Sequence, residues 1–272
     1  YWTEPKRREE IFVKASIIQE LKAIVGQAWV ATDKEDLICC GYDATPGFFN
    51  LPEVIVQPGT REEVAAVLKL ANREKIPVCT RGSGTNLSGG TVPDQGGIVL
   101  TTVRMNKIIA VDPENWTAVV EPGVIVSELN AAVEKYGLIY PPDPGTVTTA
   151  TIGGTVAENS GGLRGLKYGV TKHYVTGLEV VLADGSVAVF GGRSVKAPGY
   201  DMVMLFTGSE GTLGVITKAT VRLVPAPVHR KSMIAVFDDL NGAGRSIAAI
   251  ISNKIIPATL EILDNYTIRT VE

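Results

Sequence analysis

Glycine and hydroxyl residues gather between Cys79 and Gly97, a segment with six glycines and no lysine. A tight loop of this kind can turn several backbone N–H groups toward one anion, so it can bind a pyrophosphate without cationic side chains. Glycine permits the positive φ angles and the close backbone approach that such a loop requires. The candidate residues are the glycines and hydroxyl side chains of the loop: Gly82, Ser83, Gly84, Thr85, Ser88, Gly89 and Gly90. The loop therefore predicts a site for a dinucleotide pyrophosphate.

Two familiar phosphate-binding motifs do not fit this loop. The G-x-G-x-x-G fingerprint needs a glycine where this chain has Leu87, and it needs a helix directly afterwards. The G-x-x-x-x-G-K-[ST] loop has its spacing from Gly84 to Gly89, but Gly90 stands where the lysine should be. A surface loop without a ligand remains the alternative when this segment is considered alone.

A second stretch, from Tyr140 to Gly169, combines prolines, hydroxyl residues and paired glycines. Its prolines favour an extended approach. Gly153 and Gly154 open a short helical segment, and the N-terminus of such a segment is a candidate anion or carbonyl site. A third stretch, "FTGSEGTLGVIT", places three glycines just before a strand. The two stretches point to a larger site that is built from main-chain groups.

The elements around these loops show strand and helix periodicity. A strand at 53–58, a helix at 61–75 capped by Thr60 and a strand at 76–80 predict a βαβ-like opening. The further predicted elements are a helix at 9–26, strands at 97–103, 107–112 and 116–123, a helix at 126–137, a hairpin at 177–190 that turns at Asp184-Gly185, and a strand at 214–227. These elements position the three glycine-rich stretches in loops.

The pattern restarts after a proline-rich stretch that ends near residue 231. A strand at 233–239, a helix at 240–253 and a strand at 258–264 indicate a second, α/β-type unit. About forty residues are too few for an independent core. The predicted organisation is an N-terminal helical segment at 1–50, a main domain at 51–228 and the beginning of a second domain at 229–272.

Composition excludes several classes of function. The chain has 272 residues and a formal net charge of −3, so no broad basic face for nucleic acid is predicted. No run reaches the roughly 18 apolar residues of a membrane span, and the charged N-terminal residues lack an apolar signal core. Three cysteines form neither a disulfide framework nor a zinc site. These features predict a cytoplasmic protein with reduced cysteines.

Four motifs together resemble the FAD-binding domain of the vanillyl-alcohol oxidase (p-cresol methylhydroxylase) superfamily. They are "PVCTRGSGTNLSGG", "PPDPGTVTTATIGGTVAENSGGLRGLKYG", "GLEVVLADG" and "GYDMVMLFTGSEGTLGVIT", and they occur in the family's order. Within the superfamily the chain is most similar to the group that includes the glycolate oxidase D subunit, D-lactate dehydrogenase and D-2-hydroxyglutarate dehydrogenase. The resemblance implies an α+β fold: a two-subdomain FAD-binding domain of the p-cresol methylhydroxylase type, followed by the start of an α/β cap (substrate) domain.

The resemblance also implies a role in FAD binding for each stretch. The first would hold the pyrophosphate, the second would line the isoalloxazine and ribityl region, and the third would contact the adenosine end. The implied cofactor-binding residues are Arg81, Gly82, Ser83, Gly84, Thr85, Asn86, Leu87, Ser88, Pro142, Asp143, Gly145, Thr146, Thr149, Gly153, Gly154, Ala157, Asn159, Ser160, Gly161, Gly162, Tyr168, Gly169, Glu210, Gly211, Gly214, Val215 and Ile216. Family members with covalent flavin carry a histidine in the first loop, whereas this chain has Thr85-Asn86-Leu87 there. The implied FAD is therefore noncovalent.

The implied reaction is oxidation of a small α-hydroxy acid of the glycolate, D-lactate or D-2-hydroxyglutarate type, by hydride transfer to flavin N5. Electrons would then pass to a separate acceptor: a quinone, an electron-transfer flavoprotein or an iron–sulfur subunit. Two alternatives stay open: a noncatalytic FAD-binding or electron-transfer subunit that needs a partner chain, and a flavoenzyme like UDP-N-acetylmuramate reductase. The pairing of "GLEVVLADG" with "GSEGTLGVIT" argues against the reductase, by resemblance only.

No catalytic residue is predicted in this chain. Its two histidines, His173 and His229, do not suffice for a metal site with acidic ligands, so no metal is predicted. Related α-hydroxy-acid oxidases supply histidines, an acidic metal ligand and a substrate arginine from a later part of the chain. The resemblance therefore implies that the corresponding groups lie beyond Glu272 or on a partner chain.

Overall fold

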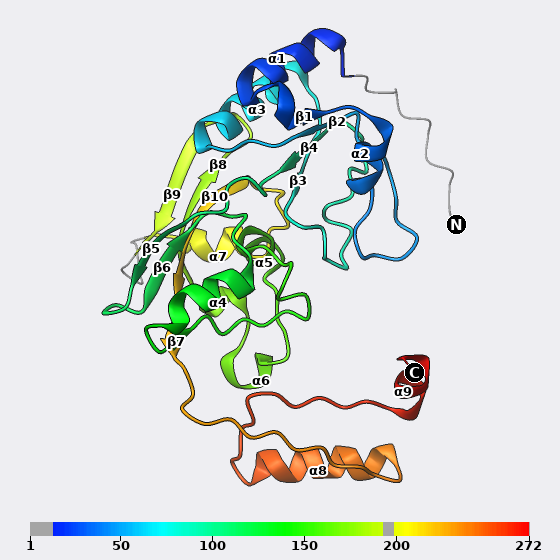
Figure 1. Cartoon of the computed structure of the whole chain (residues 1–272), viewed down its shortest axis with the longest axis vertical. Coiled ribbons are helices and arrows are strands. Elements are labelled where there is room, and N and C mark those ends of the chain that lie inside the picture. Colours follow the sequence, from blue (N-terminus) through cyan, green and yellow to red (C-terminus); the bar gives the residue numbers. More distant parts are fainter. Residues whose placement is uncertain (1–12, 193–198, 272) are drawn as a thin grey trace.

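The computed structural model describes residues 13–192 and 199–271, which include two larger β-sheets covered by helices and one small two-stranded sheet (Figure 1). The N-terminal helix begins at Ala15, and the predicted first turn at residues 9–12 lies outside the described residues. Within the described ranges, no helix is long and apolar enough to cross a membrane.

The first sheet has four strands, and it provides the strand ends that border the site. Its strand order is β1 (Val30–Ala31), β2 (Val54–Val56), β4 (Ile98–Thr101) and β3 (Val78–Arg81). Strands β2, β4 and β3 are parallel, and β1 is antiparallel to β2. The predicted strand–helix–strand unit is present as β2, α3 (Arg61–Glu74) and β3. However, β4 lies between its two strands, because β4 pairs with both of them.

Two amphipathic helices, α1 (Ala15–Val25) and α3, bury their apolar faces against this sheet. Ile17 and Leu21 of α1 share one core with Val64 of α3 and with the apolar side chains of β2. The predicted cap of α3 is confirmed, since Thr60 Oγ1 accepts a hydrogen bond of 3.2 Å from Glu63 N. Between α1 and β2 lie a 3₁₀ turn (Gln27–Trp29) and the short helix α2 (Lys34–Cys39).

The second sheet is antiparallel, with the strand order β5 (Ile108–Asp112), β6 (Thr117–Val120), β10 (Val215–Arg222), β8 (Val175–Val181) and β9 (Val187–Gly191). The predicted hairpin is confirmed, because β8 and β9 pair and Gly185 takes the positive φ of the turn, 78°. Val181 and Val215 of this sheet also pack into the core of the first sheet. The two sheets therefore share one apolar interior along this side.

Three helices pack on the second sheet: α4 (Val126–Glu134), α5 (Ile152–Glu158) and α7 (Met202–Phe206). Their buried side chains, among them Leu129, Ile152 and Phe206, meet those of β8 and β10. A two-stranded pair, β7 (Leu138–Ile139) with β11 (Val224–Pro225), lies beside α4, and the short helix α6 (Gly165–Tyr168) and a 3₁₀ turn (Thr171–His173) follow α5. Helix α5 is the element that faces the site.

The C-terminal part contains α8 (Leu240–Ser252) and α9 (Asn265–Val271), which Figure 1 shows well away from the two sheets. The predicted helix at 240–253 is confirmed, but the predicted strands at 233–239 and 258–264 are wrong. A strand needs a neighbour for its backbone hydrogen bonds, and none of the described residues pairs with these two segments. Ile234 and Val236 consequently remain more than 90% exposed. The domain boundary near residue 228 remains a prediction.

Candidate cofactor-binding site

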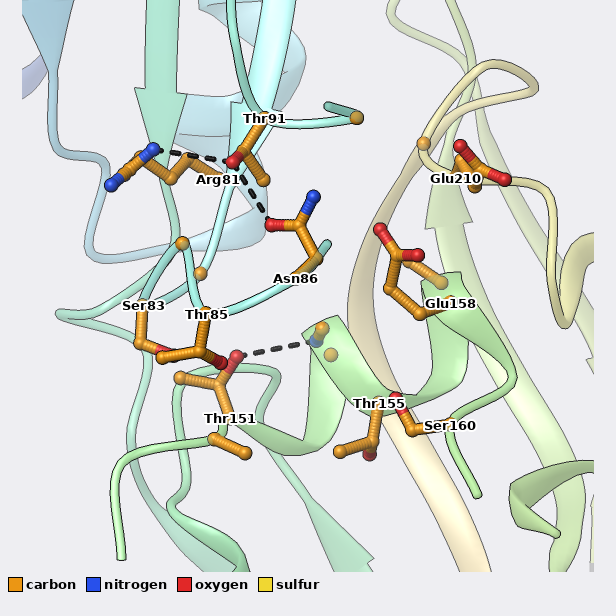
Figure 2. Close-up of a pocket in the computed structure, with 18 of the residues that line it drawn as sticks. Arg81, Ser83, Thr85, Asn86, Thr91, Thr151, Thr155, Glu158, Ser160 and Glu210 are labelled. Carbon is orange, nitrogen blue, oxygen red and sulfur yellow. Dashed lines mark hydrogen bonds between the residues drawn. The ribbon is translucent and has the colours of Figure 1, made fainter. Parts of the chain in front are cut away.

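A cavity of about 500 Å³ lies where three segments meet: the loop after β3, the start of α5 with the turn that follows it, and the loop before β10 (Figure 2). Thr80 and Arg81 at the end of β3 and Thr102 just after β4 reach its wall. Ligand sites of α/β sheets form outside the carboxyl ends of parallel strands. The cavity therefore occupies the expected position for a ligand.

The glycines of the first loop are required by close packing. A Cβ atom at Gly82 would lie 2.2 Å from Thr151 Oγ1, and one at Gly84 would lie 2.1 Å from Arg81 Nη2. Gly84 also has a positive φ of 69°. Thr151 is the N-cap of α5, and its hydroxyl accepts a hydrogen bond from Gly154 N (3.2 Å). The loop is thus packed directly on the start of α5.

Arg81 uses its charged group to hold this loop. The residue is only 8% exposed. Its Nη1 donates to Tyr42 O (2.8 Å) and to Thr91 Oγ1 (3.2 Å), and its Nη2 donates to Cys39 O (3.3 Å). The contact with Thr91 is drawn in Figure 2. Arg81 lines the cavity, but its guanidinium is occupied by main-chain and hydroxyl acceptors of the protein.

Backbone amides of the same loop fit an anion. The N–H groups of residues 83–87 donate no hydrogen bond to any of the described residues. By contrast, the amides of Gly153 and Gly154 already bond to Pro122 O (2.7 Å) and Thr151 Oγ1. The helix start, which the sequence suggested as a second anion site, therefore has fewer free donors than the loop. Successive free amides in a glycine-rich loop suit a pyrophosphate.

The loop before β10 is hydrogen-bonded to the end of α5. Gly208 N donates to Val156 O and Glu210 N donates to Ala157 O, each at 2.9 Å. Gly211 has a positive φ of 75°, and a Cβ atom there would lie 2.2 Å from Thr80 Oγ1. Close backbone contact therefore joins this segment both to α5 and to β3.

Two carboxylates, Glu158 and Glu210, border the cavity on the side of α5 and the loop before β10 (Figure 2). Ser88 Oγ reaches across and donates to Glu158 at 2.9 Å. Burial raises the pKa of Glu158; the Ser88 hydrogen bond opposes this shift, and the nearby carboxylates of Glu210 and Asp43 add to it. Carboxylates accept hydrogen bonds from hydroxyl and amino groups and repel phosphate. The cavity therefore has an amide-rich wall suited to phosphate and an acidic wall suited to a sugar or base.

The structure brings most of the residues implied by the resemblance to the cavity wall. All but six of them line it. The six exceptions are Ser88, Pro142, Asp143, Thr149, Tyr168 and Gly169. Asp143 instead forms an ion pair of 3.1 Å with Arg164 Nε, and Ser88 contacts the cavity indirectly through Glu158.

Sequence reasoning missed several residues that line the cavity. They are Thr80, Thr91, Thr102, Pro122, Ala150, Thr151, Thr155 and Glu158. Thr151 could have been found, because a threonine one residue before a helix is a common N-cap. Gly90, a candidate of the glycine loop, also lines the cavity. The others carry no local signal for a site.

Neither histidine lines the cavity. His173 Nδ1 accepts a hydrogen bond of 3.1 Å from Val170 N, so it closes a local turn, and His229 is exposed. Gly169 packs directly against the imidazole of His173, since a Cβ atom on Gly169 would lie 2.2 Å from His173 Nδ1. Among the described residues no three His, Cys, Asp or Glu side chains gather in a way that could hold a metal ion.

Comparison with known proteins agrees with this geometry. Residues 52–191 match the family model described as FAD binding domain. The chain belongs to this FAD-binding family. FAD is accordingly its cofactor, as the sequence predicted.

Two curated relatives of this FAD-binding chain are named as a glycolate oxidase subunit and a D-lactate dehydrogenase. It is 50% identical over 232 residues to glycolate oxidase subunit GlcD of Bacillus subtilis, covering 85% of this chain and 49% of the relative. It is 43% identical over 220 residues to D-lactate dehydrogenase of Archaeoglobus fulgidus, covering 80% and 49%. The chain thus spans about half the length of these curated relatives.

A solved structure of p-cresol methylhydroxylase with substrate bound matches with a TM-score of 0.72 at 25% identity, covering 86% of this chain and 48% of that one. The predicted superfamily and the mixed α and β fold class are confirmed by this match and by the family model.

Proposed function

We propose that the cavity holds FAD noncovalently, with the pyrophosphate on the backbone amides of residues 83–87. The free amides of that loop and the close packing at Gly82 and Gly84 support this placement. The described residues that line the cavity include no histidine or cysteine, so no imidazole or thiol is at hand for a covalent link.

The same proposal orients the rest of the cofactor. The adenosine end lies by residues 210–216, where the carboxylates of Glu158 and Glu210 can accept hydrogen bonds from sugar hydroxyls. The isoalloxazine lies by residues 144–162, where small residues and hydroxyl side chains leave room for a flat ring. The protein's own task at this site is to bind the cofactor and to orient it.

Acid precipitation tests the noncovalent attachment. The purified protein is expected to be yellow, and acid should leave all of the flavin in the supernatant. A yellow pellet would contradict the noncovalent assignment. Colourless protein that takes up no FAD on reconstitution would contradict the placement itself.

For the whole protein we infer FAD-dependent oxidation of a small α-hydroxy acid such as glycolate, D-lactate or D-2-hydroxyglutarate. The inference rests on the names of the two relatives, a glycolate oxidase subunit and a D-lactate dehydrogenase, at 50% and 43% identity. Bound FAD would supply the hydride acceptor, and a quinone, an electron-transfer flavoprotein or an iron–sulfur subunit would take up the electrons.

Among the described residues that line the cavity, Arg81 is the one basic side chain, and the carboxylates of Glu158 and Glu210 lie at the proposed adenosine end. An α-hydroxy acid needs a clamp for its carboxylate and a base for its hydroxyl proton. His173 closes a turn, His229 is exposed, and Arg81 is held by main-chain carbonyls. We place the clamp and the base outside residues 1–272 or on a partner chain.

Anaerobic flavin bleaching near 450 nm tests this function. Protein produced from the complete reading frame, with its partner chains, is mixed with each of the three acids, and residues 1–272 loaded with FAD are treated in parallel. Rapid bleaching by at least one acid is expected for the first sample and slow bleaching for the second. No bleaching in either sample would favour a noncatalytic electron-transfer subunit, an alternative that the word subunit in the name of one relative supports.

A further inference from the structure

The segment from Cys39 to Asn50, here called the brace, precedes the FAD-binding family match, which begins at residue 52. It folds back on itself through an antiparallel bridge between Tyr42 and Phe49 and a hydrogen bond of 2.9 Å from Asn50 N to Gly41 O. Phe48 of the brace lies against Gly89 of the glycine loop, where a Cβ atom would come within 2.8 Å of the ring. The brace therefore forms an outer support for that loop.

Hydrogen bonds connect the brace to the glycine loop on both sides of residues 83–87, the part of the loop proposed to bind the pyrophosphate. At the beginning, Arg81 Nη1 donates to Tyr42 O and Nη2 donates to Cys39 O. At the other end, Ala44 N donates to Asn86 O (3.0 Å), and Asn86 Nδ2 donates to Asp43 Oδ2 (2.7 Å). The amides of residues 83–87 lie between these two attachments.

Asn86 in turn fixes the conformation of the loop. Its Nδ2 also donates to Ser88 Oγ (3.0 Å), and its Oδ1 accepts from Thr91 Oγ1 (3.0 Å). Figure 2 shows the side chains of Arg81, Thr91 and Asn86 joined in this order. The carboxylate of Asp43 is thus the outer anchor of a network that crosses the whole loop.

Asp43 is a buried carboxylate behind the loop. It is only 7% exposed, and both of its oxygens are used, since Oδ1 accepts from Thr45 N (2.8 Å). A buried carboxylate behind a loop that binds a dianion adds charge repulsion. Any benefit of Asp43 to the site must therefore come from its hydrogen bonds and not from its charge. Charge-assisted hydrogen bonds in a buried network are strong and directional, so they can fix the loop in one conformation.

We propose that Asp43 is a positioning residue for FAD: by holding Asn86, it fixes the amides of residues 83–87 in the conformation that binds the pyrophosphate. This inference rests on the placement of FAD proposed above. It extends the FAD site to a part of the chain that lies outside the family match.

The test measures FAD affinity by titrating FAD-free protein. Asp43→Ala is expected to raise the Kd about 10- to 100-fold, the range that loss of a hydrogen bond to a charged group produces. Asp33→Ala is the matched control, since Asp33 is an exposed carboxylate of the same N-terminal part that makes no capping bond with its side chain. The control should bind FAD like the parent.

A double-mutant cycle separates positioning from general destabilisation. If Asp43 acts through Asn86, then Asp43→Ala should change the Kd little in a protein that already carries Asn86→Ala. Losses that add in full would overturn the proposal, as would a Kd for Asp43→Ala equal to that of the parent. If Asp43→Ala fails to fold, as judged by circular dichroism, Asp43→Asn replaces it in the cycle, because an asparagine can still accept from Thr45 N.

Gly84→Val distinguishes this inference from the placement of FAD on the loop. If Gly84→Val binds FAD like the parent, the placement itself is wrong. If Gly84→Val loses FAD while Asp43→Ala retains it, the placement stands and the role of Asp43 is refuted.

Discussion

Gly84→Val is the sharpest perturbation of the cavity, because two independent constraints act on this residue. Its φ of 69° is a conformation that β-branched residues rarely adopt. A Cβ atom there would also lie 2.1 Å from Arg81 Nη2 and 2.2 Å from Arg81 Cζ. The guanidinium has no simple way to move aside, since it is buried and hydrogen-bonded to Tyr42, Thr91 and Cys39.

The magnitude follows from these two constraints. The left-handed backbone costs a residue with a side chain about 1–2 kcal/mol. Displacing Arg81 from even one of its acceptors costs about 1.5–3 kcal/mol, because the donor is charged. In the FAD-free variant the loop can relax, so its FAD-binding conformation must be restored when FAD binds. Both costs then reduce the affinity for FAD. Together they amount to about 2.5–5 kcal/mol, or roughly a 60- to 4,000-fold increase in Kd.

The assay is equilibrium titration of FAD-free protein with FAD, followed by flavin fluorescence. Gly137→Val is the matched control: Gly137 has nearly the same φ, 66°, but no atom lies within 4 Å of the position that its Cβ would take. It should lower the melting temperature and leave FAD affinity unchanged. Equal FAD affinity for Gly84→Val and the parent would show that this loop does not hold the pyrophosphate, whatever the melting temperatures.

Two further predictions concern stability. The FAD-free protein should melt at a lower temperature and be cleaved by protease within residues 141–162, because a ligand present at a hundredfold excess over its Kd stabilises the folded state by about 2.7 kcal/mol; equal melting temperatures with and without FAD would contradict this. Glu158→Gln should change how the stability of the FAD-free protein depends on pH. Burial raises the pKa of Glu158 in the folded state above its usual 4.5, so its contribution to stability is most favourable below that pH and falls as the pH rises through the folded-state pKa. The parent should therefore lose stability relative to Glu158→Gln as the pH increases above 4.5, and a difference independent of pH would contradict it.

Local chemistry made several parts of the fold predictable from the sequence. The cap at Thr60, the turn at Asp184-Gly185 and the glycine loop each depend on residues close together in the chain. A side-chain hydroxyl or a positive φ at one position determines them. For the same reason the glycine-rich stretches could be expected to form one site before their arrangement was known.

Features that depend on distant pairing could not be predicted in this way. The insertion of β4 between β2 and β3 is one example, because its parallel partners lie more than 15 residues away in the sequence. The brace is another, since nothing near Asp43 in the sequence indicates that its carboxylate will meet Asn86. The strands expected at 233–239 and 258–264 failed for a related reason: apolar alternation indicates a strand, but only a neighbouring strand can complete its hydrogen bonds.

A crystal structure of the protein with FAD bound would show directly whether the loop after β3 holds the pyrophosphate. We expect the pyrophosphate oxygens to lie about 2.7–3.2 Å from backbone nitrogens of residues 83–87, the usual range for N–H···O hydrogen bonds. We also expect the guanidinium of Arg81 to remain on Tyr42 O and Cys39 O, and the hydrogen bond between Asp43 and Asn86 to be intact. A pyrophosphate held away from this loop, or held mainly by cationic side chains, would show that the placement of FAD on the loop is wrong.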